Sequence, residues 1–107
     1  MTTFDKREEA FERQFAHDAE LKFKAEARRN KLLGLWAADR LGKNGADADA
    51  YAKQVVAADF EEPGHAGVLR KLLGDLTANG LAVTESEIRA KMSELLATAV
   101  AQVKAGQ

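Results

Sequence analysis

The side chains that could carry out chemistry in this chain of 107 residues are few and scattered. Cysteine is absent, which excludes disulfides, thiolate metal sites and cysteine nucleophiles. The two histidines, His17 and His65, stand alone, because neither has a second histidine or a cysteine at a metal-ligand spacing. We therefore expect no metal site and no cofactor. His17 is expected to pair with Asp18 on the surface, and His65 to be a solvated turn residue.

Adjacent carboxylates occur twice, as Glu8 with Glu9 and as Glu61 with Glu62. A general acid and base need a cleft with an apolar wall that shifts a pKa, and a small helical domain offers little of either. No serine lies in the glycine-flanked turn that exposes a nucleophile. The sequence therefore predicts a protein that is not an enzyme.

Basic side chains form the one candidate ligand site. Lys43 lies within the glycine-rich segment 42–45, and Arg28, Arg29 and Lys31 cluster half a helix earlier. The segment lacks the glycine spacing and the following Ser or Thr of a phosphate-binding loop. ADP or ATP binding by these four residues is the alternative hypothesis for function. Otherwise the residues around Arg28 are solvated partners of acids such as Glu26.

Charge and hydropathy exclude other partners. Sixteen basic and seventeen acidic side chains give a formal net charge of −1, so no overall field attracts nucleic acid or an anionic membrane. No apolar run approaches the roughly 18 residues of a membrane span. The N-terminus also lacks the basic and apolar pattern of a secretory signal. We expect a cytoplasmic protein that does not insert into a membrane.

Apolar residues recur at intervals of three and four along nearly the whole chain, and only one proline interrupts it. This pattern predicts helices over residues 4–41, 46–61 and 65–78. A fourth helix follows Thr84, which forms a capping box with Glu87. Short turns between helices favour antiparallel neighbours. The predicted fold is all-α, a mostly antiparallel four-helix bundle.

Gly34 lies inside the first helix, where it costs about 1 kcal/mol unless another backbone comes close. We interpret it as a helix-crossing point. The predicted core consists of large apolar side chains from all four helices: Leu32, Leu35, Trp36, Val55, Phe60, Leu69, Leu72, Leu76, Ile88, Met92 and Leu95.

The first helix is too long for its partners. At about 1.5 Å per residue it reaches roughly 58 Å, whereas the later helices reach roughly 23 to 33 Å. Residues 1–20 are therefore predicted to overhang as an arm, and residues 21–107 to form the bundle. The arm nevertheless carries Phe4, Phe11 and Phe15 on one stripe of its surface. An apolar stripe without an internal partner indicates an external one.

Several segments together resemble a known family. They are FD at 4–5, RE at 7–8, AHDAEL at 16–21, FKAEARRNKLLGLWAA at 23–38, YA at 51–52 and ADFE at 58–61. The chain resembles the inhibitory zeta subunit of the alphaproteobacterial F-type ATP synthase.

The resemblance implies a four-helix protein that blocks ATP hydrolysis. Its N-terminal segment, here Met1 to about Ala19, would enter an interface of the catalytic alpha and beta subunits near the gamma shaft. The protein would then lie in the cytoplasm, peripheral to the inner membrane through the ATP synthase head. We expect an arm that is mobile or frayed when free and helical when bound. Its expected contact residues are Phe4, Asp5, Arg7, Glu8, Phe11, Glu12, Arg13 and Phe15.

Overall fold

A computed structural model describes the backbone of residues 2–106 and the side chains of residues 19–106. It contains four α helices: α1 (Thr2–Arg40), α2 (Gly45–Ala58), α3 (Ala66–Ala78) and α4 (Glu85–Lys104). A short 3-10 helix, η1 (Pro63–His65), precedes α3. The described residues contain no strand, which confirms the all-α class. None of the helices described is long and apolar enough to cross a membrane.

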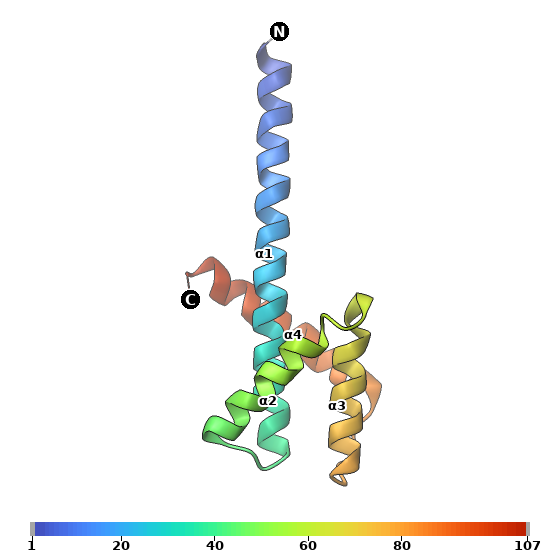
Figure 1. Cartoon of the computed structure of the whole chain (residues 1–107). Coiled ribbons are helices and arrows are strands. Elements are labelled where there is room, and N and C mark those ends of the chain that lie inside the picture. Colours follow the sequence, from blue (N-terminus) through green and yellow to red (C-terminus); the bar gives the residue numbers. More distant parts are fainter. Residues whose placement is uncertain (1, 107) are drawn as a thin grey trace.

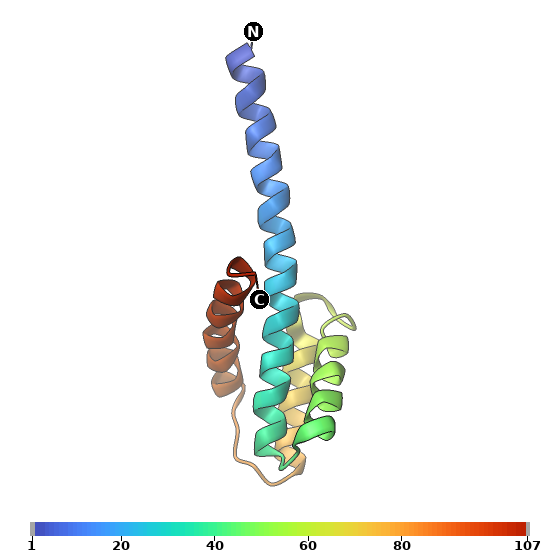
Figure 2. The same ribbon diagram turned by 90° about the vertical axis from the view of Figure 1, so that its left-hand side faces the viewer.

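Helix α1 sets the shape of the molecule. The chain measures 65 × 25 × 21 Å, and its long dimension is close to the roughly 58 Å of a 39-residue helix. Figure 1 shows the first half of α1 standing clear of the other helices. In Figure 2 its second half lies between α2 and α4, and α3 lies behind it. The three other helices are therefore packed around the second half of α1.

The core lies where α2, α3 and α4 meet α1. Its buried side chains are Leu33, Ala37, Ala38, Tyr51, Val55, Val68, Leu69, Leu72, Leu76, Ile88 and Met92. Two alanines of α1 belong to this core, and such small side chains let the neighbouring helices approach closely. Most of the core residues predicted on α3 and α4 are confirmed.

The face of α1 that is buried differs from the predicted one. Leu33, not Leu32 or Leu35, is fully buried, and the two flanking leucines are only half-buried. Trp36 packs against the core from its edge, and the Arg40 guanidinium lies 4.7 Å from its ring centroid. Because α2 and α4 cover α1 from two sides, small residues occupy the centre and the largest side chains lie on the flanks.

The prediction that Phe60 is a core residue was wrong. Helix α2 ends at Ala58, so the helical spacing that would bury Phe60 does not extend to it. Its side chain is 70% exposed.

The helix ends follow the local signals in the sequence. After α1, the Gly42 N–H donates to the Asp39 carbonyl at 3.2 Å and the Lys43 N–H to the Ala38 carbonyl at 2.8 Å. With Gly42 at φ +75°, this is the left-handed Schellman stop of a helix. At the start of α4, the Glu87 N–H donates to the Thr84 hydroxyl oxygen at 3.2 Å, which confirms the predicted cap.

A buried tyrosine ties α2 to α3. The Tyr51 hydroxyl donates to the Asp75 carboxylate at 2.7 Å, and the Lys71 ammonium lies 5.0 Å from the tyrosine ring centroid. Burial raises the pKa of Tyr51 above its usual value, and the hydrogen bond to Asp75 raises it further. The phenol is therefore held neutral in the folded state.

Gly34 lies at the crossing of α1 and α2, as predicted. A Cβ atom at this position would lie 2.6 Å from the Ala52 Cα and 3.2 Å from the Val55 Cγ2. We expect Gly34→Ala to destabilise the fold by about 1 to 3 kcal/mol, because the crowded atom belongs to a backbone that must shift. Chemical denaturation followed by circular dichroism measures the change.

Gly74 on α3 provides the matched control. A Cβ atom there would meet nothing within 4 Å. Gly74→Ala should therefore stabilise the protein by about 0.5 to 1 kcal/mol, the difference in helix propensity. Equal effects of the two substitutions would show that α1 and α2 do not cross closely at Gly34.

Candidate functional site

The predicted partner contacts lie on the first half of α1. All eight, from Phe4 to Phe15, fall within the helix but outside the residues whose side chains are described, as does His17. In a helix, positions 4, 11 and 15 share one side. The part of the site whose side chains are described begins where α1 first packs against the other helices.

A buried polar network lies at this point. Arg29 and Asn30 are 4% and 1% exposed. The Arg29 guanidinium donates to the Asn30 side-chain oxygen from Nε at 3.1 Å and from Nη2 at 3.0 Å. The Asn30 amide nitrogen in turn donates to Asp59 Oδ2 at 2.8 Å. These bonds join α1 to the end of α2.

His65 extends the network to the start of α3. It has a left-handed backbone, with φ +68°, directly before the first residue of α3. Its Nδ1 lies 2.8 Å from Asp59 Oδ1, to which an Nδ1–H would donate, and 3.2 Å from Arg29 Nη2. Its Nε2 lies 3.7 Å from Glu26 Oε1. The prediction of a solvated turn residue was wrong, because the turn folds His65 back onto α1.

Burial dominates the electrostatics of Arg29. Removal of the guanidinium from water lowers the pKa of Arg29, and the charges of Asp59 and Glu26 partly offset that effect. In the described part of the chain, no buried side-chain nitrogen or oxygen lacks a hydrogen-bond partner. The network therefore holds α1 against the connection between α2 and α3 with its polar groups satisfied.

The sequence contains one signal for this network. Glu26, Arg29 and Asn30 are spaced three and four apart, so they share one face of α1. Their partners, Asp59 and His65, lie in the segment that had been assigned to a helix end and a turn. Polar residues that share one helix face with neighbouring alanines indicate a face that packs against another helix.

The four basic residues of the nucleotide hypothesis do not converge. Arg29 belongs to the buried network, whereas the Arg28 Nη1 donates to the Gln102 side-chain oxygen of α4 at 3.3 Å. Lys43 lies beyond the other end of α1, with its ammonium 6.0 Å from the Tyr51 ring centroid. Only Arg28 and Lys31 share a recess.

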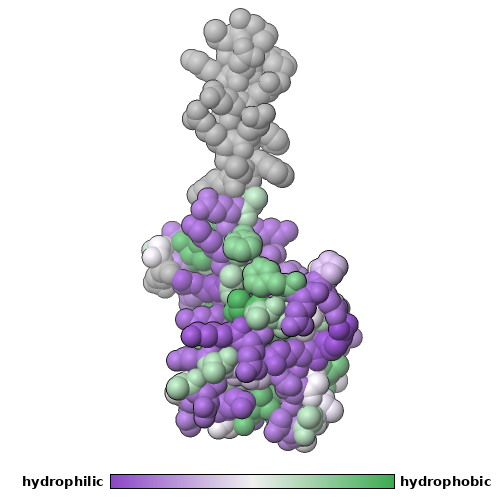
Figure 3. Space-filling model, in the orientation of Figure 1, coloured by the Kyte–Doolittle hydropathy of each residue, from purple (hydrophilic) through white to green (hydrophobic). Residues whose placement is uncertain are grey.

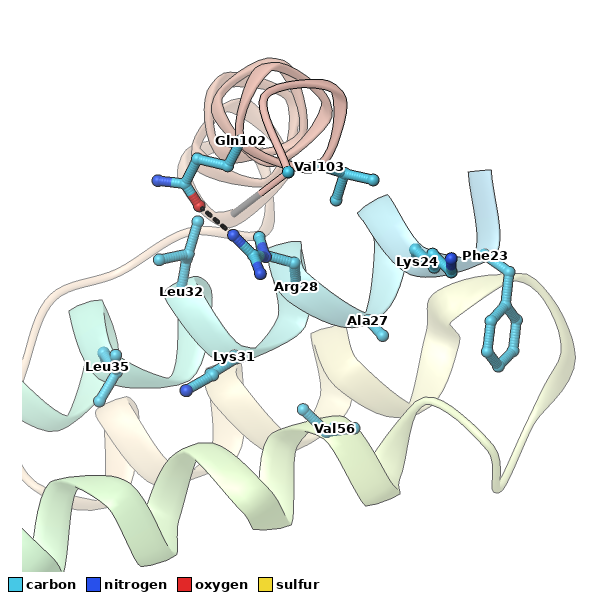
Figure 4. Close-up of a pocket in the computed structure, with 11 residues that line it drawn as sticks. Phe23, Lys24, Ala27, Arg28, Lys31, Leu32, Leu35, Val56, Gln102 and Val103 are labelled. Atoms are coloured by element: carbon cyan, nitrogen blue, oxygen red, sulfur yellow. Dashed lines mark hydrogen bonds between the residues drawn. The ribbon is translucent and has the colours of Figure 1, made fainter. Parts of the chain in front are cut away.

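That recess is an open groove of about 780 Å³ between α1, the α2 side chain Val56 and the last turn of α4 (Figure 4). Its apolar lining is Phe23, Ala27, Leu32, Leu35, Val56 and Val103, and its basic lining is Lys24, Arg28 and Lys31. We call it the root groove, because it lies where the free half of α1 joins the rest. Among the described residues, no three His, Cys, Asp or Glu side chains converge as a metal site would require.

Comparisons with known proteins agree with this architecture. A solution NMR structure of another protein is similar, with a TM-score of 0.71 and 55% identity, over 81% of this chain and 99% of that chain. No curated protein matches. The model of one family, ATPase inhibitor subunit zeta, matches residues 1–102 and confirms the resemblance. The chain therefore belongs to the family of ATPase inhibitor subunit zeta, whose members are regulatory, non-catalytic proteins with the ATP synthase as partner.

Proposed function

We propose that this protein blocks ATP hydrolysis by inserting the arm, residues 1–20, at an interface of the alpha, beta and gamma subunits of the ATP synthase head. Residues 21–107 form the second unit, a mostly antiparallel bundle that carries the arm. One observation supports this proposal most. Helix α1 starts at Thr2, yet the other helices pack only along its second half. A long helical half without packing partners of its own is suited to packing against another protein.

The proposed mechanism is steric. A helix wedged between subunits resists the opening and closing that accompany each hydrolysis cycle. Phe4, Phe11 and Phe15 act as apolar anchors on one side of the arm, since buried aromatic side chains dominate most interfaces. Polar contacts surround them, made by Asp5, Arg7, Glu8, Glu12 and Arg13.

The bundle limits how far the arm enters. A single helix is about 10 to 12 Å wide with its side chains, whereas the molecule is 25 × 21 Å in cross-section. A crevice that fits one helix excludes the four-helix part. The buried network at Arg29 and Asp59 also keeps α1 fixed to the bundle. A force that displaces the arm therefore acts on the whole molecule.

The arm is mobile or frayed when free and becomes ordered in the complex. The protein is then located in the cytoplasm, peripheral to the inner membrane through the ATP synthase head. ADP or ATP binding by Arg28, Arg29, Lys31 and Lys43 is the alternative function. It has less support, because these residues belong to separate parts of the structure. Saturable NMR shifts confined to them on titration with ADP would favour it.

Deletion of residues 1–19 tests the proposed function. We expect the shortened chain to lose inhibition of ATP hydrolysis by the purified ATP synthase head. The described core lies entirely beyond the deletion, so thermal melting followed by circular dichroism should remain cooperative. Inhibition that survives the deletion would contradict the role of the arm. Loss of cooperative melting would show instead that the arm belongs to the core.

A further inference from the structure

We propose that the root groove is a second docking surface, which binds an acidic amphipathic segment of the same ATP synthase head that receives the arm. This inference rests on the proposed function. It adds a contact that the arm does not make.

The first support is exposed apolar surface. Phe23 is 61% exposed at the groove, and Phe60, at the end of α2, is 70% exposed. Figure 3 shows hydrophobic atoms gathered on the face formed by α1 and α2. Large aromatic side chains left in water in this way indicate an interaction surface more often than chance. Phe23 lines the recess of about 780 Å³, which provides room for the side chains of a partner.

The second support is the charge of the groove, which determines the chemistry of its occupant. Lys24, Arg28 and Lys31 line it, and none of its lining residues is acidic, although the Lys24 ammonium also pairs with Glu20 outside the lining at 3.0 Å. The adjoining hollow is lined by Lys31 and Lys53 together with one acid, Asp49. Because the whole chain has a net charge of −1, these cations are a local feature. A segment that presents carboxylates next to apolar side chains is complementary to this lining.

The third support is position along α1. Phe23 lies about 12 Å along the helix axis from Phe15, and Lys31 about 12 Å further. A protein that encloses the arm as far as residue 19 has its rim within a few turns of the groove. Both surfaces belong to helix α1, so a partner that encloses the arm can also reach the groove. Figure 4 shows Lys31 and Val56 lining the space between α1 and α2, where such a rim would fit.

The experiment uses the full-length chain and the purified ATP synthase head. Fluorescence titration measures the dissociation constant for the parent and for the double variant Phe23→Ala with Lys31→Glu. We expect the double variant to bind about tenfold or more weakly, since it removes an apolar contact and places like charges opposite each other. Both side chains are exposed, so thermal melting should not change.

Lys43→Glu is the matched control, because it makes the same charge change beyond the other end of α1. It should bind like the parent. If the groove variant also binds like the parent, the root groove is not a docking surface, even where the arm still inhibits. If the parent neither binds nor inhibits the head, the proposed function itself fails. If the groove variant instead abolishes self-association seen by sedimentation, the occupant is a second copy and the proposal is overturned.

Discussion

Replacement of Asp59 by alanine is expected to lower the free energy of unfolding by about 1 to 3 kcal/mol, the cost of leaving a buried hydrogen-bond donor without its acceptor. Asp59 accepts hydrogen bonds from Asn30 and His65, both at 2.8 Å. Its charge also favours the charged form of Arg29, which is 4% exposed. Without it, a buried cation keeps only Glu26 as a counter-charge. The whole stability of such a domain is about 5 to 15 kcal/mol, so the loss is large.

Denaturant unfolding followed by circular dichroism measures this effect. The control is Glu62→Ala in the same connection, which removes a carboxylate paired with the exposed Arg70. Exposed pairs contribute little, so the control should cost less than about 1 kcal/mol. If both variants unfold at the same denaturant concentration, the network does not hold α1 against the connection between α2 and α3.

Simultaneous replacement of Phe11 and Phe15 by alanine is expected to weaken inhibition of ATP hydrolysis roughly thirtyfold while the fold persists. The two residues are four apart on α1, so their rings can enter one groove of a partner as neighbouring anchors. Truncation of a buried aromatic anchor commonly costs about 2 kcal/mol or more. Half of the additive sum for two anchors corresponds to about thirtyfold, at 1.4 kcal/mol per factor of ten. Titration of ATP hydrolysis with each variant measures the ratio.

A charge variant on the same arm serves as the comparison. Glu9→Ala with Arg13→Ala removes a pair four residues apart, which is usually worth less than about 1 kcal/mol when exposed. Inhibition should change little. The opposite pattern, a potent phenylalanine variant and an inactive charge variant, would mean that the partner recognises the charge pattern of the arm. The apolar-anchor mechanism would then have to be abandoned.

Local signals made the helices of this protein predictable from sequence. The cap at Thr84 and the crossing at Gly34 each depend on one residue and its near neighbours, and the structure confirms both. The helical face that packs inward depends on distant partners. In the stretch from Leu32 to Ala38, almost every position is apolar, so periodicity alone could not decide between Leu33 and its neighbours.

The buried polar network around Arg29 could not be predicted in detail from the sequence. Arg28 and Arg29 are adjacent in sequence, but successive side chains of a helix point about 100° apart. The first therefore reaches Gln102 on α4, and the second is buried beside Asn30. The contacts of His65 could not be predicted for a related reason. Its left-handed backbone reverses the chain and brings the ring to Asp59 and Glu26, which no local pattern specifies.

The anchoring of α1 in the bundle also changes what helix formation costs the arm. An isolated segment must first form a helical nucleus, with an equilibrium penalty on the order of one in a thousand. In this chain Ala25, fully buried, and the network at Arg29 already hold the next turns of the same helix in place. Helix growth into the arm then proceeds by propagation alone, one hydrogen bond for each residue fixed. Under the proposed function, the packed half of α1 thus serves as a permanent nucleus, from which the arm extends as a helix when a partner surface favours it.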